Sequence, residues 1–441
     1  MCTFLFRRIS IPGSLKPLIK ALSVCTNYKI DIDTYLIFST TLSVFLTVLL
    51  ARKGVDIFVG YPVVLINTAV LIVQNRLIIH RNHLLIILAI FFISLFVSAD
   101  SSTPAAAILA QIIGITLFSV YFFSMLVNSG ISLARWARIY AMLAFWIAVV
   151  GLVAYAMRKM HLLPVTQETR LRSIYSEPSL FVYATLPAFG LYFNTWLRHR
   201  THKIEIAIFG ISYGLAGSSL GYLGVLLMVS VSVLPKLKFW KMLLLTVAGA
   251  AAMVGTYFIS TNFRMRVIDL ALAMSQKNIS NTNSTTFAIL SNAYVSFQTF
   301  LKHPFFGVGI GGYQYQYAKY VPFLGNNLQD STLVTLNMYD ANSLILRVIA
   351  EMGGIGLLAL TGFVVFCGVV KGPLHVSIRN AILPYIIIRM SRFGAWFSLE
   401  LYFFVGIYFL NYLQSRANYG LTMLAVNRIE KNTLGHQREV Q

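Results

Sequence analysis

The sequence predicts an all-α polytopic membrane protein with about 12 transmembrane helices. Hydrophobic residues make up 57% of the chain and charged residues only 11%, whereas a soluble domain carries about 25% charged residues. Apolar runs recur along all 441 residues, and each is long enough to cross a hydrocarbon core about 30 Å thick. Composition and run length together exclude a string of soluble domains.

The predicted transmembrane segments are separated by short polar connections that carry basic residues. We expect spans over residues 34–51, 56–74, 83–99, 104–127, 139–157, 178–196, 205–218, 219–234, 242–260, 342–365, 380–394 and 395–413. Two stretches are less regular. Residues 205–234 also fit one kinked helix, and Arg389 and Arg392 interrupt the run over 380–413.

The basic residues predict the orientation of the chain in the membrane. With a cytoplasmic N-terminus, more than half of the 35 Lys and Arg residues fall in the inner loops and the two tails, as the positive-inside rule requires. The formal charge of +21 is therefore explained by orientation, and nucleic acid is not expected as a partner. The three cysteines, Cys2, Cys25 and Cys367, lie in the N-terminal tail or an apolar span, so they predict neither disulfides nor a metal site.

Two outer segments are longer than the other connections, and long loops are usually functional or disordered. The chain accordingly divides into a basic cytoplasmic tail (1–33), N-terminal transmembrane helices (34–157), a first outer catalytic loop with the following spans (158–260), a large outer loop (261–341), C-terminal transmembrane helices (342–413) and a cytoplasmic tail (414–441). The large loop turns amphipathic and aromatic after residue 286, which predicts helices at the membrane surface.

The first outer loop ends in RLRSIYSEPS, where charge is concentrated at the edge of an apolar run. Arg170 and Arg172 offer forked donors that suit phosphate oxygens. Glu177 precedes Pro178, a residue that suits the first turn of a helix. The segment therefore fits either a phosphate site or a capped helix with snorkelling arginines.

A second arginine pair follows the ninth predicted span. Arg264 and Arg266, in TNFRMRVID, fall on the same outer face as the first pair. Each pair alone also fits an interfacial anchor. Two R-x-R pairs on the outer face suit a diphosphate.

The large loop contains a glycine-rich and aromatic stretch, HPFFGVGIGGYQYQY (303–317). Its glycines allow tight turns and close backbone approach, but the Walker lysine is missing, so an ATP site is not expected. His303 is either a base or a residue at a turn, and the turn is favoured. Tyr313 is suited to stacking on a sugar, although an aromatic belt at the membrane interface explains it too.

NSLILRVIAEMGGIG (342–356) opens a span that carries Arg347 and Glu351 at i and i+4. Ionisable residues inside a membrane helix indicate function, and this spacing also suits an internal ion pair. Among the acidic residues of the outer face Glu177 ranks first as a catalytic group, and Asp340, next to Asn342, ranks second.

Three motifs in this order give the sequence a family resemblance. SEPS with its upstream arginines (170–179), HPFFGVGIGGY (303–313) and N-S-x9-G-x2-G from Asn342 to Gly356 resemble the bacterial O-antigen polymerases (Wzy-like) and the related O-antigen ligases. The resemblance covers roughly residues 160–360.

The resemblance implies a C-type glycosyltransferase-like architecture in the bacterial inner membrane, with a large periplasmic loop and an active site that faces the periplasm. It implies transfer of a glycan from undecaprenyl pyrophosphate, without cofactor or metal, and a chain-length regulator and a flippase of the same pathway as partners. The positions it implies are Glu177, Arg172 and Arg264 as catalytic, and Arg170, Arg266, His303, Tyr313, Asp340 and Asn342 as substrate-binding.

The sequence departs from the ligase pattern at one position. The third ligase motif begins with histidine, where this chain has Asn342, and asparagine has no basic nitrogen at neutral pH. The departure favours a polymerase and leaves the general base unassigned. A ligase and a flippase for lipid-linked oligosaccharide remain the alternatives.

Overall fold

The computed structural model describes residues 32–46, 49–52, 55–57, 59–101, 103–162, 170–175, 177–238, 240–241, 284–324, 335 and 337–417, with separate positions between 247 and 271. Its helices are α2 (Ile32–Phe45), α3 (Gly60–Val73), α4 (Arg81–Ser101), α5 (Ala105–Asn128), α6 (Leu133–Lys159), α7 (Pro178–His199), α8 (Lys203–Ala216), α9 (Ser219–Val233), α12 (Ser284–Lys302), α13 (Tyr313–Tyr320), α14 (Leu344–Gly368) and α15 (Pro373–Arg392), with short 3₁₀ turns η2 (Leu234–Lys236) and η3 (Val321–Leu324). A last helix covers residues 399–417. Strands β1 (Leu49–Arg52) and β2 (Val55–Ile57) form an antiparallel hairpin between α2 and α3.

The predicted helical fold is confirmed for the described residues, and it is consistent with a membrane protein. Four described helices are long and apolar enough to cross a membrane: Arg81–Ser98, Ala105–Asn128, Leu133–Lys159 and Leu344–Cys367. Three more apolar helices, α2, α3 and α9, are shorter than a full span. Most of the predicted span over residues 242–260 lies outside the described residues.

Serine side chains define where several helices begin. Ser132, Ser218 and Ser343 stand at the N-caps of α6, α9 and α14, and each hydroxyl accepts a hydrogen bond from the backbone N–H three residues later. A cap of this kind satisfies a donor that the helix itself leaves unpaired. The first residues of these helices are therefore specified locally.

The two irregular stretches each contain two helices. Gly217, with φ of +55°, ends α8, and Ser218 begins α9. Further along, α15 ends at Arg392, and the last helix begins at residue 399, after a connection of six residues. We call the connection the 393–398 turn. Both breaks coincide with residues that disfavour a continuous apolar helix.

Helix α7 is the centre of the larger helix group, where it packs against α6, α8, α9 and α15. Small residues allow close approach to α9. A Cβ at Gly221 would lie 2.9 Å from Val182, and one at Gly224 would lie 2.8 Å from Leu186. The small residues of GSSLGYLG (217–224) therefore serve close helix packing.

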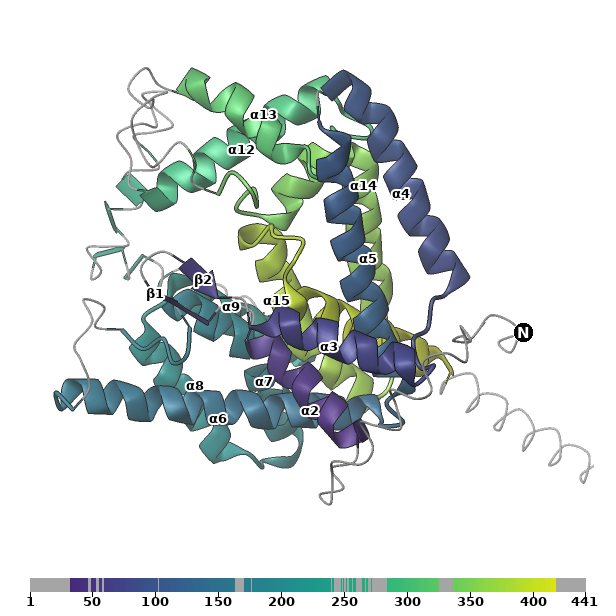
Figure 1. Cartoon of the computed structure of the whole chain (residues 1–441). Helices are drawn as coiled ribbons and strands as arrows, with labels where there is room; N and C mark the ends of the chain where they lie inside the picture. Colours follow the sequence, from purple (N-terminus) through teal and green to yellow (C-terminus); the bar gives the residue numbers. More distant parts are fainter. Residues whose placement is uncertain are drawn as a thin grey trace, which may run out of the picture.

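Helices α12 and α13 lie together across one end of the long helices α5 and α14 (Figure 1). Both belong to the predicted large outer loop, and α12 packs along α14. The two form a small core of their own around Val295, Tyr313 and Tyr317. In this part of the predicted loop, residues 284–324 therefore form a layer that packs against α14.

Candidate functional site

The glycine loop, residues 303–312, docks into a break in α14. Gly353 has φ of +63° and ψ of −156°, which interrupts the helix. Four backbone hydrogen bonds join the loop to this break: Val308 N to Ala350 O (2.9 Å), Gly309 N to Glu351 O (3.0 Å), Gly354 N to Pro304 O (2.7 Å) and Ile355 N to Phe305 O (3.2 Å). A Cβ at Gly353 would lie 2.5 Å from the carbonyl of Phe305. Two of the three motifs of the resemblance are thus interlocked.

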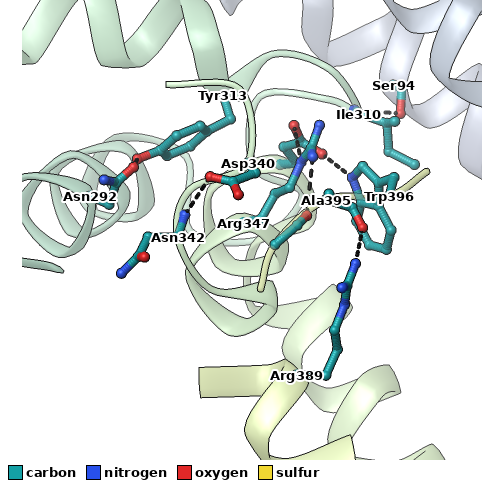
Figure 2. Close-up of polar contacts among 12 residues, drawn as sticks. Ser94, Asn292, Ile310, Tyr313, Asp340, Asn342, Arg347, Arg389, Ala395 and Trp396 are labelled. Atoms are coloured by element: carbon teal, nitrogen blue, oxygen red, sulfur yellow. Dashed lines mark hydrogen bonds and ion pairs between the residues drawn. The ribbon is translucent and has the colours of Figure 1, made fainter. Parts of the chain in front are cut away.

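The glycines of this loop serve packing, because the donors that a phosphate cradle would need are engaged. Val308 and Gly309 donate to α14, Ile310 donates to the Ser94 hydroxyl at 3.2 Å, and Gly312 donates to Gly309. Figure 2 shows the contact between Ile310 and Ser94. The loop therefore fastens the α12–α13 layer to α4 and α14.

His303 and Tyr313 stand at either end of the glycine loop. His303 lies at the turn after α12, where its carbonyl accepts from Gly307. Tyr313 is buried, and its hydroxyl donates to Asn292 Oδ1 at 2.6 Å (Figure 2). Burial raises the pKa of Tyr313 well above its ordinary value, and Asp340 and Arg347 also act on that pKa, which places the ring beside both. Tyr313 therefore supports the site from within the protein.

Asp340 and Asn342 lie in a backbone segment of unusual conformation. Asn337, Ala341 and Asn342 have φ of +59°, +57° and +55°, a region that non-glycine residues rarely adopt and that occurs often at functional sites. The Asn342 N–H donates to Asp340 Oδ1 at 3.0 Å (Figure 2). Asn342 Oδ1 accepts from Arg392 at 2.7 Å and from Asn337 at 3.1 Å.

The Asp340 carboxyl is the group of this site best suited to acid–base chemistry. Burial raises its pKa above the ordinary value. The Asn342 N–H and the charges of Arg347, Arg389 and Arg392 act in the opposite direction, and burial dominates. A carboxylate whose pKa moves toward neutrality is a better proton acceptor at neutral pH.

Arg347 and Glu351 form a buried ion pair on α14. Their side chains are 5% and 0% exposed, with Arg347 Nε 3.1 Å from Glu351 Oε1. Trp396 Nε1 donates to Glu351 Oε2 at 2.7 Å, and Arg347 lies over the Trp396 ring. The spacing at i and i+4 predicted this pair, and the structure confirms it.

A second buried pair lies between α15 and the last helix. Arg389 Nη1 lies 3.6 Å from Glu400 Oε1, and the two side chains are 3% and 12% exposed. Arg389 also donates to the Ala395 carbonyl (Figure 2). Sequence reasoning missed this pair because it treated Arg389 and Arg392 as an interruption of a span. The available signal was their position inside an apolar run.

The 393–398 turn is held by side chains from several helices. Arg347 donates to the Gly394 carbonyl at 3.1 Å, and Tyr61 donates to the Phe397 carbonyl. Gly394 itself packs against the carbonyl oxygens of Asp340 and Ser343, so closely that a side chain there would collide. We call the residues joined by this turn the paired cluster: Asp340, Asn342, Arg347, Glu351, Arg389, Arg392 and Glu400.

The arginine segment, residues 170–177, lies before α7. Arg170 and Glu177 are exposed, and Arg172 is half-buried. Glu177 is the N-cap residue of α7, but its carboxylate makes no cap and instead accepts from the Ser179 hydroxyl at 2.9 Å. Tyr175, at the end of the segment, is buried, and burial raises its pKa well above the ordinary value, with the charge of Glu400 acting in the same direction.

The second arginine pair is described in part. Arg264 is exposed and helical, and Arg266 lies outside the described residues. Among the sequence-predicted site residues, the structure brings Asp340, Asn342 and Tyr313 together. It places Arg170, Arg172 and Glu177 on another segment, and it contains no group of three His, Cys, Asp or Glu side chains that could hold a metal within the described ranges.

No protein-family model and no curated protein sequence matches this chain. The O-antigen polymerase family therefore remains a resemblance carried by the three motifs. The functional argument depends on the chemistry of the paired cluster and of the arginine segment.

Proposed function

We propose that this protein is a polymerase of an O-antigen-type surface polysaccharide in the bacterial inner membrane. It transfers the growing glycan from undecaprenyl pyrophosphate to a lipid-linked repeat unit on the periplasmic side. The observation that carries the proposal is Asp340: burial raises the pKa of this carboxyl, which lies among three arginines in a segment of positive φ. A helical membrane protein with such a group at one end suits transfer chemistry on a lipid-linked donor.

Asp340 is the general base in this proposal. The acceptor hydroxyl oxygen attacks the anomeric carbon of the donor sugar, and the bond from that carbon to the phosphate oxygen breaks. The hydroxyl proton passes to the Asp340 carboxylate, and undecaprenyl pyrophosphate leaves as the anion. The sequence ranked Glu177 above Asp340. Glu177 is exposed and its carboxylate accepts from the Ser179 hydroxyl, whereas Asp340 belongs to the paired cluster, which favours the reverse order.

The leaving diphosphate is stabilised by arginines that remain accessible. Arg347 and Arg389 are engaged by Glu351 and Glu400, whereas Arg170 and Arg264 are exposed. Fixed cations at a developing negative charge stabilise a transition state without a metal. Arg172 and Arg266 complete the two R-x-R pairs, and Glu177 orients the first pair.

The site favours a polymerase over the two alternatives. In a ligase a histidine would stand where Asn342 lies, and here the Asn342 amide oxygen accepts two hydrogen bonds in place of a basic nitrogen. A flippase is expected to place ionisable residues along a central path. Among the described residues, the two buried ion pairs, Arg347–Glu351 and Arg389–Glu400, instead lie around the 393–398 turn.

The test is chain extension by the purified protein on a lipid-linked repeat unit. We expect products of increasing length on a gel, and alanine at Arg170, Arg172, Arg264 and Arg266 together is expected to abolish them. Lysine at the same positions is expected to rescue little, because an ammonium lacks the fork that meets two phosphate oxygens. Transfer of the glycan only to a different acceptor would indicate a ligase, and wild-type extension by the four-alanine variant would place the phosphate site elsewhere.

The periplasmic side and the twelve spans are part of the same proposal. Ser284, exposed at the start of α12, provides the test. A cysteine at this position is expected to react with an impermeant thiol reagent in intact spheroplasts. Labelling only after lysis would place the large loop in the cytoplasm and contradict the proposed orientation.

A further inference from the structure

The Arg389–Glu400 pair is buried at a junction that the proposed chemistry does not itself use. Arginine stays charged under any condition a protein meets, and a buried charge without a partner is strongly destabilising. Glu400 supplies the balancing charge at 3.6 Å, and the Ser398 hydroxyl donates to Glu400 at 2.5 Å. The pair therefore fixes a full positive charge and a full negative charge at one place beside the site.

A continuous chain of contacts leads from this pair to Asp340. Arg389 donates to the Ala395 carbonyl in the 393–398 turn. The neighbouring Gly394 packs against the backbone of Asp340, while Arg347 holds the Gly394 carbonyl from the other side. Displacement of Arg389 would therefore move the backbone against which Asp340 rests.

We propose that the Arg389–Glu400 pair is the positioning device of this site, and that it sets both the place of the Asp340 carboxylate and its readiness to take up a proton. The role given to Asp340 as the proton acceptor in glycan transfer rests on the proposed function. The coupling between the pair and Asp340 is independent of any substrate.

The sign of the coupling follows from the charges that face Asp340. These are Arg347 on α14, Arg389 and Arg392 on α15, with the Tyr313 hydroxyl on α13. Arg389 stabilises the ionised carboxylate. Glu400, its ion-pair partner at 3.6 Å, carries the opposite charge, so we expect it to offset part of that effect. Loss of the Glu400 charge favours the carboxylate, whereas loss of the Arg389 charge favours the neutral acid.

The experiment measures protonation of Asp340 without a substrate. Dicyclohexylcarbodiimide reacts with protonated carboxyl groups, so the labelled fraction of the Asp340 peptide, measured by mass spectrometry over about pH 4 to pH 9, gives a titration midpoint. Full-length protein in detergent is compared with Glu400→Gln and Arg389→Gln. We expect the midpoint to move down in Glu400→Gln and up in Arg389→Gln, by roughly half a pH unit or more.

Glu205→Gln is the matched control. Glu205 is a partly buried carboxylate on α8 that contacts His202 at 2.8 Å, away from the 393–398 turn. Its removal changes the net charge as Glu400→Gln does, and we expect it to leave the midpoint unchanged.

The double variant Arg389→Gln/Glu400→Gln guards against misfolding of a single variant. It leaves no uncompensated charge, and its midpoint is expected between those of the two single variants. Size-exclusion elution and thermal unfolding identify folded samples. Because the double variant and Glu400→Gln differ only by Arg389, equal midpoints in these two proteins would overturn the inference even if Arg389→Gln fails to fold.

Two results separate this inference from the proposed function. Opposite shifts in a protein that extends no glycan would sustain the coupling and refute the polymerase. Shifts of the same sign, or none, in a protein that extends glycan would sustain the polymerase and refute the coupling.

Discussion

The arginine segment and the paired cluster hold their charges in opposite ways. Arg170 and Glu177 are exposed, whereas the side chains of Arg347 and Glu351 are 5% and 0% exposed and lie 3.1 Å apart. An exposed charge costs little to keep and is able to meet a ligand, while a buried charge requires a partner and a fixed geometry. The first region suits capture of a phosphate, and the second suits placement of a reacting group.

The contrast extends to the backbone. The arginine segment joins α8 through a hydrogen bond from Leu171 N to Leu215 O (3.1 Å), and it joins α6 through a hydrogen bond from the Ser173 hydroxyl to Ile147 O (2.7 Å). The paired cluster is fixed by a break in α14, a loop docked into that break and three residues of positive φ. Strain of this kind persists only where the surroundings determine it, so the second region is the more sensitive to substitution.

The largest effect is expected on activity at Asp340. Asp340→Asn keeps the shape and removes the proton acceptor, so chain extension should fall by about 10²- to 10⁴-fold. In Glu177→Gln, chain extension should fall by no more than about tenfold, because the loss of a carboxylate that only orients the arginines leaves partial activity. Rates of extension by the purified variants decide, and a greater loss in Glu177→Gln would reverse the roles of the two regions.

The next largest difference is expected in how much substitutions in the paired cluster and in the arginine segment change the free energy of unfolding. Arg347→Ala leaves Glu351 buried without its partner, at a cost of about 3–5 kcal/mol in the free energy of unfolding. Arg170→Ala, at an exposed position, should change it by no more than about 0.5 kcal/mol. Denaturant unfolding in detergent measures both. Replacing both Arg347 and Glu351 by Met removes both charges and should recover part of the lost free energy of unfolding. No recovery would show that the unpaired charge of Glu351 is not the main cause of the loss in Arg347→Ala.

A pair of glycines sharpens the comparison. Gly353, in the break of α14 beside the paired cluster, and Gly217, beside the arginine segment, both have positive φ. Alanine at Gly353 would meet the Phe305 carbonyl at 2.5 Å, whereas alanine at Gly217 would meet only the flexible Arg170 side chain at 3.6 Å. We expect Gly353→Ala to cost roughly 2–4 kcal/mol and Gly217→Ala about 1 kcal/mol. Equal melting temperatures of the two variants would show that the glycine loop moves aside for the methyl group added at Gly353.

The smallest effect is expected at Ala341, a buried alanine with φ of +57°. Glycine adopts this conformation without steric cost. Ala341→Gly should therefore raise the free energy of unfolding by up to about 1 kcal/mol. The same substitution at Ala207, on the exposed face of α8, should lower it by about 1 kcal/mol. Loss of stability in both proteins would indicate that backbone strain at Ala341 is negligible.

The region around the glycine loop and α14 shows how far local sequence patterns predict structure. Serine caps, the Gly217 break and the Arg347–Glu351 spacing are all local signals. The sequence predicted the ion pair from its spacing and offered two helices over 205–234 beside one kinked helix, and the structure has two. The glycine loop was different. Its composition also fitted a phosphate cradle, and only the docking into α14 showed that its N–H groups are engaged.

The sequence by itself indicated the helical membrane-protein class and the ion pair within α14, because hydropathy and i, i+4 spacing act over a few residues. It left residues 205–234 open between two helices and one kinked helix. The tertiary structure alone decided the composition of the paired cluster. Arg347 meets Gly394, 47 positions away, and the glycine loop reaches Ser94 across 216 positions. Such contacts depend on how α14, α15 and the last helix pack, and no periodicity along the chain records that. In the sequence alone, Arg389 therefore interrupts a predicted span, and only the fold shows that Glu400 is its partner.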